Sequence, residues 1–144
     1  MKTIQKIYET EADKLVELEL GRKYHDYYDP QVELHNNGFL STYDFSIIRN
    51  GRLVGFLEVK KKIGDWWKQE IIPTTKWQYA KNCPHPCYLL IERDDKALLF
   101  NVTDLIEKNA GYICEITRRP DQPEGSTKVV KFPVSFGKPI WYSE

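Results

Sequence analysis

The feature that most constrains the fold of this chain is a pair of β-rich runs separated by Arg49-Asn50-Gly51. The runs span residues 44–48 and 52–60. Asn-Gly between two such runs is the strongest local signal for a β-hairpin, because both residues tolerate the positive φ angles of a tight turn. The sequence therefore predicts two adjacent antiparallel strands here.

The register of this hairpin decides which side chains share a face, because successive side chains of a strand point to opposite faces. With a two-residue turn at Asn50 and Gly51, Asp44 and Glu58 lie on opposite faces of the sheet. With a three-residue loop over residues 49–51, Asp44, Glu58 and Lys60 share one face. We expect the three-residue loop.

Two carboxylates and a lysine on one face suit metal-assisted hydrolysis of a phosphodiester. Mg²⁺ prefers oxygen ligands, so the candidate ligands are Asp44, Glu58 and the backbone carbonyl of Val59. The metal would polarise the phosphate and activate a water. Lys60 would orient that water or stabilise the charge of the transition state. The alternative is an exposed strand whose charged residues only prevent pairing with other strands.

Asp44 together with Glu58-Val59-Lys60 resembles the motif of the PD-(D/E)xK nuclease superfamily, which includes restriction enzymes, Holliday-junction resolvases and some homing endonucleases. Tyr43 stands where the name of the motif has proline. The resemblance implies an α/β fold with a restriction-endonuclease-like core, in which helices flank a central mixed β-sheet in the order αβββαβ. It also implies Mg²⁺ as the cofactor, with Mn²⁺ as a substitute, and products that carry a 5′-phosphate and a 3′-hydroxyl.

The resemblance further implies an acid on the helix before the hairpin. Apolar residues at helical spacing predict that helix over residues 3–20, and the stripe consists of Ile4, Ile7, Leu15 and Leu18. Glu11 falls inside this stripe, and a buried carboxylate needs a metal, a lysine or an ordered water as its partner. We therefore expect Glu11 to support the site as a further metal ligand, with Glu9 as its substitute. The alternative is that Glu11 reaches solvent at the edge of the stripe.

A second helix is predicted over residues 74–82, because Pro73 marks a break and the threonines after it can cap a helix. Gln78 matches the polar residue, often glutamine, that the resemblance implies on this helix, where it would contact the scissile phosphate or its water. An ordinary solvated glutamine is the alternative.

Lysines are frequent between the second strand of the hairpin and the end of this helix, and they are interleaved with Trp66, Trp67 and Tyr79. Such a surface suits a phosphate backbone and unstacked bases. The expected DNA contacts are Lys61, Lys62, Lys68, Lys76 and Lys81. The alternative is that the paired tryptophans pack in the protein or at a dimer contact.

Downstream of this helix the pattern alternates between strands and a short helix. Strands are predicted over residues 87–93, 97–101, 112–117 and 128–134, with a helix over 102–109. We expect one domain, residues 1–144, with the nuclease core over about 3–101 and a C-terminal β elaboration over about 102–144.

Cys83, His85 and Cys87 lie within five residues and are possible zinc ligands. Zinc motifs usually use two clusters of ligands, whereas this chain has one such cluster. No zinc is expected here, and the segment is interpreted as a proline-stiffened connector.

The charge of the chain limits how it can bind DNA. It has 21 basic and 21 acidic residues, so DNA contacts must be local or shared across an oligomer. A chain of this size has one active site, and cutting both strands of a duplex would need a homodimer or homotetramer. No apolar run approaches the length needed to span a membrane, the first residues lack the apolar core of a signal peptide, and a cytoplasmic location is expected.

The sequence thus predicts a metal-dependent DNA endonuclease that hydrolyses phosphodiester bonds through a metal-activated water. Holliday-junction resolvase, compact homing endonuclease, and restriction or repair nuclease all remain open within this class. The alternative from another class is a noncatalytic nucleic-acid-binding or assembly module on the same fold.

Overall fold

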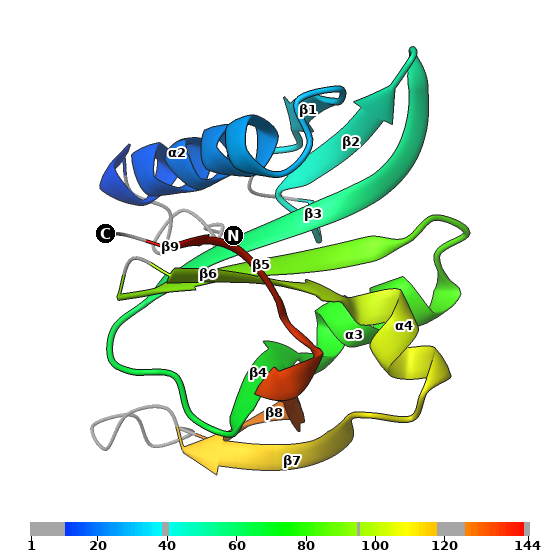
Figure 1. Ribbon diagram of the computed structural model, residues 1–144. Coiled ribbons are helices and arrows are strands. Elements are labelled where there is room, and N and C mark those ends of the chain that lie inside the picture. The colour runs from blue at the N-terminus through cyan, green and yellow to red at the C-terminus, as the bar shows by residue number, and fades with distance from the viewer. Residues whose placement is uncertain (1–10, 39–40, 95, 118–125, 143–144) are drawn as a thin grey trace, which may run out of the picture.

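The chain folds into two β-sheets with helices packed against the larger one, as Figure 1 shows. The computed structural model describes residues 11–38, 41–94, 96–117 and 126–142. The larger sheet has six strands in the order β1-β2-β3-β5-β6-β9. Their bounds are β1 (Glu33–Asn36), β2 (Phe45–Arg49), β3 (Arg52–Lys62), β5 (Cys87–Arg93), β6 (Lys96–Asn101) and β9 (Lys138–Tyr142). Strands β3 and β5 are parallel and the other neighbours are antiparallel, so the sheet is mixed.

The smaller sheet has three strands in the order β4-β8-β7. Its strands are β4 (Gln69–Pro73), β7 (Tyr112–Thr117) and β8 (Ser126–Pro133), and a short 3-10 helix, η1 (Val134–Phe136), follows β8. Both sheets contain strands from the last third of the chain, since β9 pairs with β6. The C-terminal residues are therefore part of the central sheet as well as of the smaller one.

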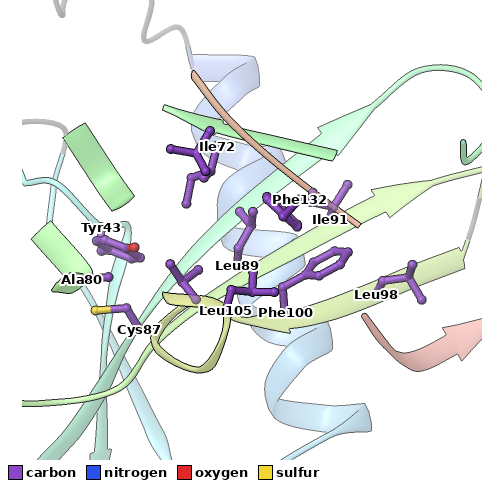
Figure 2. Close-up of a cluster of buried hydrophobic side chains, with 12 residues drawn as sticks. Tyr43, Ile72, Ala80, Cys87, Leu89, Ile91, Leu98, Phe100, Leu105 and Phe132 are labelled. Atoms are coloured by element: carbon purple, nitrogen blue, oxygen red, sulfur yellow. The ribbon is translucent and has the colours of Figure 1, made fainter. Parts of the chain in front are cut away.

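Helices cover both faces of the six-stranded sheet. Helix α2 (Glu11–Tyr27) packs on one face, and helices α3 (Thr74–Asn82) and α4 (Val102–Glu107) lie on the other face with the smaller sheet (Figure 1). Each face has its own apolar core. Figure 2 shows the core on the side of α3 and α4, where Phe100 and Phe132 meet edge to face with ring centroids 5.0 Å apart. This is the α/β architecture with a mixed sheet that the resemblance implies.

The hairpin turn differs from the expected one. Arg49 pairs with Arg52, so the turn contains two residues, and the prediction of a three-residue loop is wrong. Asn50 and Gly51 both have positive φ angles, 52° and 76°, which suits the mirror-image turns whose twist matches that of the strands. The sequence alone leaves both turns open, because Asn-Gly is compatible with either.

A β-bulge restores the shared face that the two-residue turn would have removed. Ile48 pairs with Leu53 but Ile47 pairs with Gly55, so Val54 is an extra residue in β3. Beyond the bulge Phe45 pairs with Leu57, and the next position brings Asp44 opposite Glu58. The two acids therefore share a face because of the bulge.

Helix α2 extends further and has a different phase than the sequence predicts. It continues to Tyr27, and its buried residues are Leu20, Gly21 and Tyr24. Leu15 and Leu18, from the predicted stripe, are 66% and 44% exposed. Ile4, Ile7 and Glu9 lie outside the described residues. The physical reason is a close approach to β2 centred on Gly21.

Gly21 lets α2 pack directly on the aromatic ring of Phe45. A Cβ atom at Gly21 would lie 2.6 Å from Cζ of Phe45, closer than any ordinary contact. The C-terminal half of α2 therefore docks on the sheet next to Asp44.

Among the helices that the structure describes, none is long and apolar enough to cross a membrane.

Candidate active site

Asp44 and Glu58 lie together where β2 begins beside β3. The backbone N–H of Val59 donates a hydrogen bond of 3.0 Å to Oδ2 of Asp44. Glu58 is only 3% exposed. Burial and the neighbouring Glu58 carboxylate raise the pKa of Asp44 to about 8, and burial also raises the pKa of Glu58. A buried and a partly buried acid, both with raised pKa values, indicate a position that is suited to a cation.

The two carboxylate oxygens of Glu58 have different surroundings. Oε2 lies 3.1 Å from Nζ of Lys76. Oε1 is buried and has no hydrogen-bond partner among the described residues. A buried carboxylate oxygen without a partner is costly, so its lone pairs are available to a ligand.

Lys76 was expected on the DNA-binding surface, but its side chain points into the site. It is 18% exposed, and besides Glu58 its ammonium group donates a hydrogen bond to the backbone carbonyl of Thr42. It also lies 5.7 Å from the centre of the Tyr43 ring. Lys76 therefore neutralises part of the acidic site from helix α3.

Lys60 lies two residues beyond Glu58 on β3 and is exposed. Its positive charge lowers the pKa of Glu58, against the effect of burial. Glu58, Lys60 and Lys76 together line a cavity of about 300 Å³ between the two sheets. The remaining lining residues are Lys62, Ile71, Ile72, Pro73, Leu89, Ile116, Lys128 and Val129. Lysines from three different elements thus line one cavity together with the buried carboxylate of Glu58.

The acid that α2 brings near the site is Glu17, and the prediction that Glu11 faces the sheet is wrong. Glu11 is exposed in the first turn of α2. Six residues of helix separate it from Glu17, about 9 Å along the axis. Glu17 is 15% exposed, and its charge contributes to raising the pKa of Asp44.

Glu17 is joined to the strand side by polar contacts. The side-chain amide of Asn36 donates to Oε2 of Glu17 at 2.6 Å, and Nζ of Lys14 lies 3.2 Å from the same oxygen. The backbone N–H of Asn37 donates to the carbonyl oxygen of Asp44 at 2.8 Å. The sequence contains a pattern that could have placed Glu17 on the face of α2 toward the sheet. Leu20, Gly21 and Tyr24, which are buried on that face, follow Glu17 at helical spacing.

Gln78 does not line the cavity that contains Glu58. It is exposed and lies in a separate, open groove of about 520 Å³ with Thr42, Thr75, Tyr79, Asn82, Cys83 and Pro84. Gln78 is two residues beyond Lys76, a rotation of about 200° around a helix. The two side chains therefore point to opposite sides of α3.

The other lysines expected to contact DNA have two kinds of position. Lys61 lies 3.5 Å from buried Glu92, and Lys62 lies 2.8 Å from buried Glu70, on opposite faces of the sheet. Lys68 and Lys81 are exposed. Their roles toward DNA stay predictions.

Cys83 and Cys87 interact through their thiols, and burial and Cys83 together raise the pKa of Cys87 to about 12. Both are free cysteines.

Within the described ranges no three His, Cys, Asp or Glu side chains converge on a common metal position. A Mg²⁺ site does not require such a cluster, because Mg²⁺ commonly uses one or two carboxylates together with waters and substrate phosphates.

The two acids and the unpaired oxygen of Glu58 fit a divalent cation of this kind. The donor set is made of hard oxygens, and Lys76 shows that a positive charge is already favourable there. In a β-strand, the backbone N–H and the carbonyl of one residue point toward the same neighbouring strand. The carbonyl of Val59 therefore points toward Asp44, as its N–H does.

A comparison of the sequence with known protein families gives a match. A family model described as "Phage putative PDDEXK endonuclease" matches residues 3–138, and that range contains Asp44, Glu58 and Lys60. The chain matches none of the curated proteins. Because the family match covers almost the whole chain, the protein belongs to this family of PD-(D/E)xK endonucleases and is a nuclease.

Proposed function

We propose that the protein is a Mg²⁺-dependent DNA endonuclease, with Asp44 and Glu58 as the metal ligands and Mn²⁺ as a substitute metal. The observation that carries the proposal is the buried Glu58 carboxylate. It lies beside Asp44, and one of its oxygens has no partner within the part of the chain that the structure describes. A metal-dependent nuclease holds its cation next to the scissile phosphodiester, and this position faces a cavity lined by lysines.

Each residue of the site has a role that follows from its position. Asp44 and Glu58 hold the cation, and the carbonyl of Val59 adds a third oxygen. A divalent cation held there polarises the phosphate and makes a water more acidic. The hydrogen bond from Val59 keeps Asp44 oriented. Glu17 on helix α2 is linked to the backbone of Asp44 through Asn36, and its negative charge adds to the attraction for a cation.

Lys60 carries the charge that acts on the phosphate. Its ammonium group is on the same face of β3 as Glu58 and reaches the cavity. In the transition state of phosphodiester hydrolysis the negative charge on phosphate oxygens increases, and a lysine already in place stabilises it. The products are a 5′-phosphate and a 3′-hydroxyl, as the resemblance implies.

The chain has one pair of acids of this kind among its described residues, so one protomer cuts one strand at a time. Cleavage of both strands of a duplex requires two copies, and we propose that the active form is a homodimer or homotetramer. DNA contacts beyond the cavity come from exposed lysines such as Lys68 and Lys81.

The test is a cleavage panel with supercoiled plasmid, a branched junction and single-stranded DNA, each with Mg²⁺, Mn²⁺ or EDTA. The expected result is cleavage with either metal, none with EDTA, and none by Glu58→Gln. The preferred substrate distinguishes a junction resolvase from the other nuclease types. DNA binding without cleavage under every condition would contradict the proposal and favour a noncatalytic binding module.

A further inference from the structure

Lys76 occupies a position that the Glu-x-Lys motif does not account for. Its ammonium group lies 3.1 Å from Oε2 of Glu58 and donates to the carbonyl of Thr42. It approaches from α3, whereas Lys60 approaches from β3. The site therefore contains two lysines on different elements that line one cavity.

We propose that Lys76 is a second lysine of the active site with two positions. While Asp44 and Glu58 hold no metal, Lys76 neutralises Glu58. When they hold one, Lys76 turns into the cavity and stabilises the negative charge of the scissile phosphodiester. This inference rests on the proposed function, because it requires a divalent cation at Asp44 and Glu58.

The charges at the site require the first position. Glu58 is 3% exposed and lies beside Asp44, on which the negative charge of Glu17 also acts. A buried carboxylate without a compensating charge is strongly unfavourable, so it becomes protonated or acquires a cation. The Lys76 ammonium group, 3.1 Å from Oε2 of Glu58, is that cation.

The same charges require Lys76 to move. A divalent cation on Glu58 and an ammonium group within about 4 Å of it repel each other strongly where the dielectric constant is low. Lysine has a flexible four-carbon stem and a compact charge, so the side chain can turn while the helix stays in place. The cavity that Lys76 already lines offers it a place next to the substrate.

The position of helix α3 does not depend on the ion pair. The hydroxyl of Tyr43 donates a hydrogen bond of 3.0 Å to the backbone carbonyl of Lys76, and Ala80 of the same helix is buried in the core. The Lys76 side chain is thus free to exchange partners without loss of the helix. An ion pair that served only to anchor α3 would be redundant with these contacts.

The first test follows the Lys76 ammonium group by ¹H–¹⁵N NMR of lysine side chains in the wild-type protein without DNA. Lys76→Arg identifies the Lys76 signal by its loss, and Lys108, which follows α4 and is paired with Asp104, is the control. Mg²⁺ binding is measured in parallel by calorimetry. The expected result is that saturating Mg²⁺ shifts or removes the Lys76 signal and leaves that of Lys108 unchanged.

The second test is single-turnover cleavage by Lys76→Met at saturating Mg²⁺. The rate should fall by about a hundredfold, the effect of removing one donor to the transition state, while the affinity for DNA changes less than about threefold. Lys76→Arg should retain part of the rate, and Lys108→Met should cut at the wild-type rate.

The outcomes separate this inference from the proposed function. If calorimetry shows no Mg²⁺ binding by the wild-type protein, the metal site itself is wrong and the inference falls with it. If Mg²⁺ binds but the Lys76 signal does not change, Lys76 is a fixed ion-pair partner and only the inference is overturned. The NMR measurement uses the wild-type fold, so it decides the question even if Lys76→Met does not fold.

Discussion

The backbone N–H of Val59 holds the carboxylate of Asp44 by a hydrogen bond of 3.0 Å. Asp44 precedes strand β2, in an irregular segment, whereas Val59 is in the middle of β3. This bond fixes an acid outside the regular sheet to the strand that carries Glu58. The bulge at Val54 sets the register that brings Asp44 opposite Glu58, and the hydrogen bond from Val59 orients the carboxylate of Asp44.

The lysine of the motif is tested by Lys60→Met, which keeps the aliphatic stem and removes the ammonium group. The cleavage rate should fall by about two to three orders of magnitude, and DNA affinity should change much less. Lys108→Met is the matched control, because Lys108 is exposed just after the end of α4 and does not line the cavity. A Lys60→Met enzyme that cuts at the rate of the control would remove Lys60 from the mechanism.

The two glutamates of helix α2 should behave differently. Glu17→Gln removes a negative charge that attracts a cation to Asp44 and alters the contact through Asn36, and we expect cleavage at limiting Mg²⁺ to fall about 10- to 100-fold, the range for residues just outside the metal ligands. Glu11→Gln should cut normally, because Glu11 is exposed. Mg²⁺ titrations of the cleavage rate compare the two, and the opposite order of sensitivity would show that α2 is rotated.

The contact between α2 and β2 is tested by Gly21→Ala. In an exposed helix this change stabilises by about 1 kcal/mol, but here the new Cβ would lie 2.6 Å from Cζ of Phe45. We expect destabilisation by about 1–3 kcal/mol, measured by urea unfolding. In a Phe45→Leu background the cost of Gly21→Ala should be smaller, and an equal cost in both backgrounds would show that the two residues do not interact.

The buried carboxylate of Glu70 makes a pH-dependent contribution to stability. It accepts hydrogen bonds of 2.8 Å from both Lys62 and Arg93. Burial raises its pKa, but these bonds from Arg93 and Lys62 outweigh that effect and hold the pKa of Glu70 below its usual range. A lowered pKa in the folded state means that the stabilisation is present above the unfolded pKa of about 4.3 and is lost as the pH falls below it.

The Glu70 contribution is measured by urea unfolding of the wild-type protein and Glu70→Gln from pH 7 to pH 3. The variant should be less stable by about 3–5 kcal/mol at pH 7, because two partly buried cations lose their buried partner. The difference should narrow below about pH 4.3. A difference that stays constant over this range would show that the charge of Glu70 does not contribute.

Local patterns in the sequence were sufficient for much of the fold. Helix α3 and strands β5 and β7 begin and end as predicted, because their limits are marked by proline, turn residues and alternating apolar side chains. Strands β1, β4 and β9 were not predicted. Each is short and joins its sheet through pairing with segments distant in sequence, and local propensity does not report such pairing.

The site was predicted in part for a related reason. Asp44 and Glu58 do meet, but through a bulge at Val54 that no local signal marks. The phase of α2 depends on the contact of Gly21 with Phe45, which is tertiary. The inward direction of Lys76 has a weak signal, since buried Ala80 lies one helical turn later.

The central claim is that Asp44 and Glu58 share one divalent cation, and Mn²⁺ binding measured by electron paramagnetic resonance tests it most directly. The experiment compares the wild-type protein with Asp44→Asn and Glu58→Gln without DNA. Both substitutions keep the size of the side chain, and their folding is checked by circular dichroism.

We expect the wild-type protein to bind Mn²⁺ and each variant to bind it at least about a hundredfold more weakly, a larger loss than removal of a group that merely orients a ligand. Mg²⁺ should compete with Mn²⁺ for the wild-type site. Equal Mn²⁺ affinity in all three proteins, or no binding by the wild-type protein, would contradict the account.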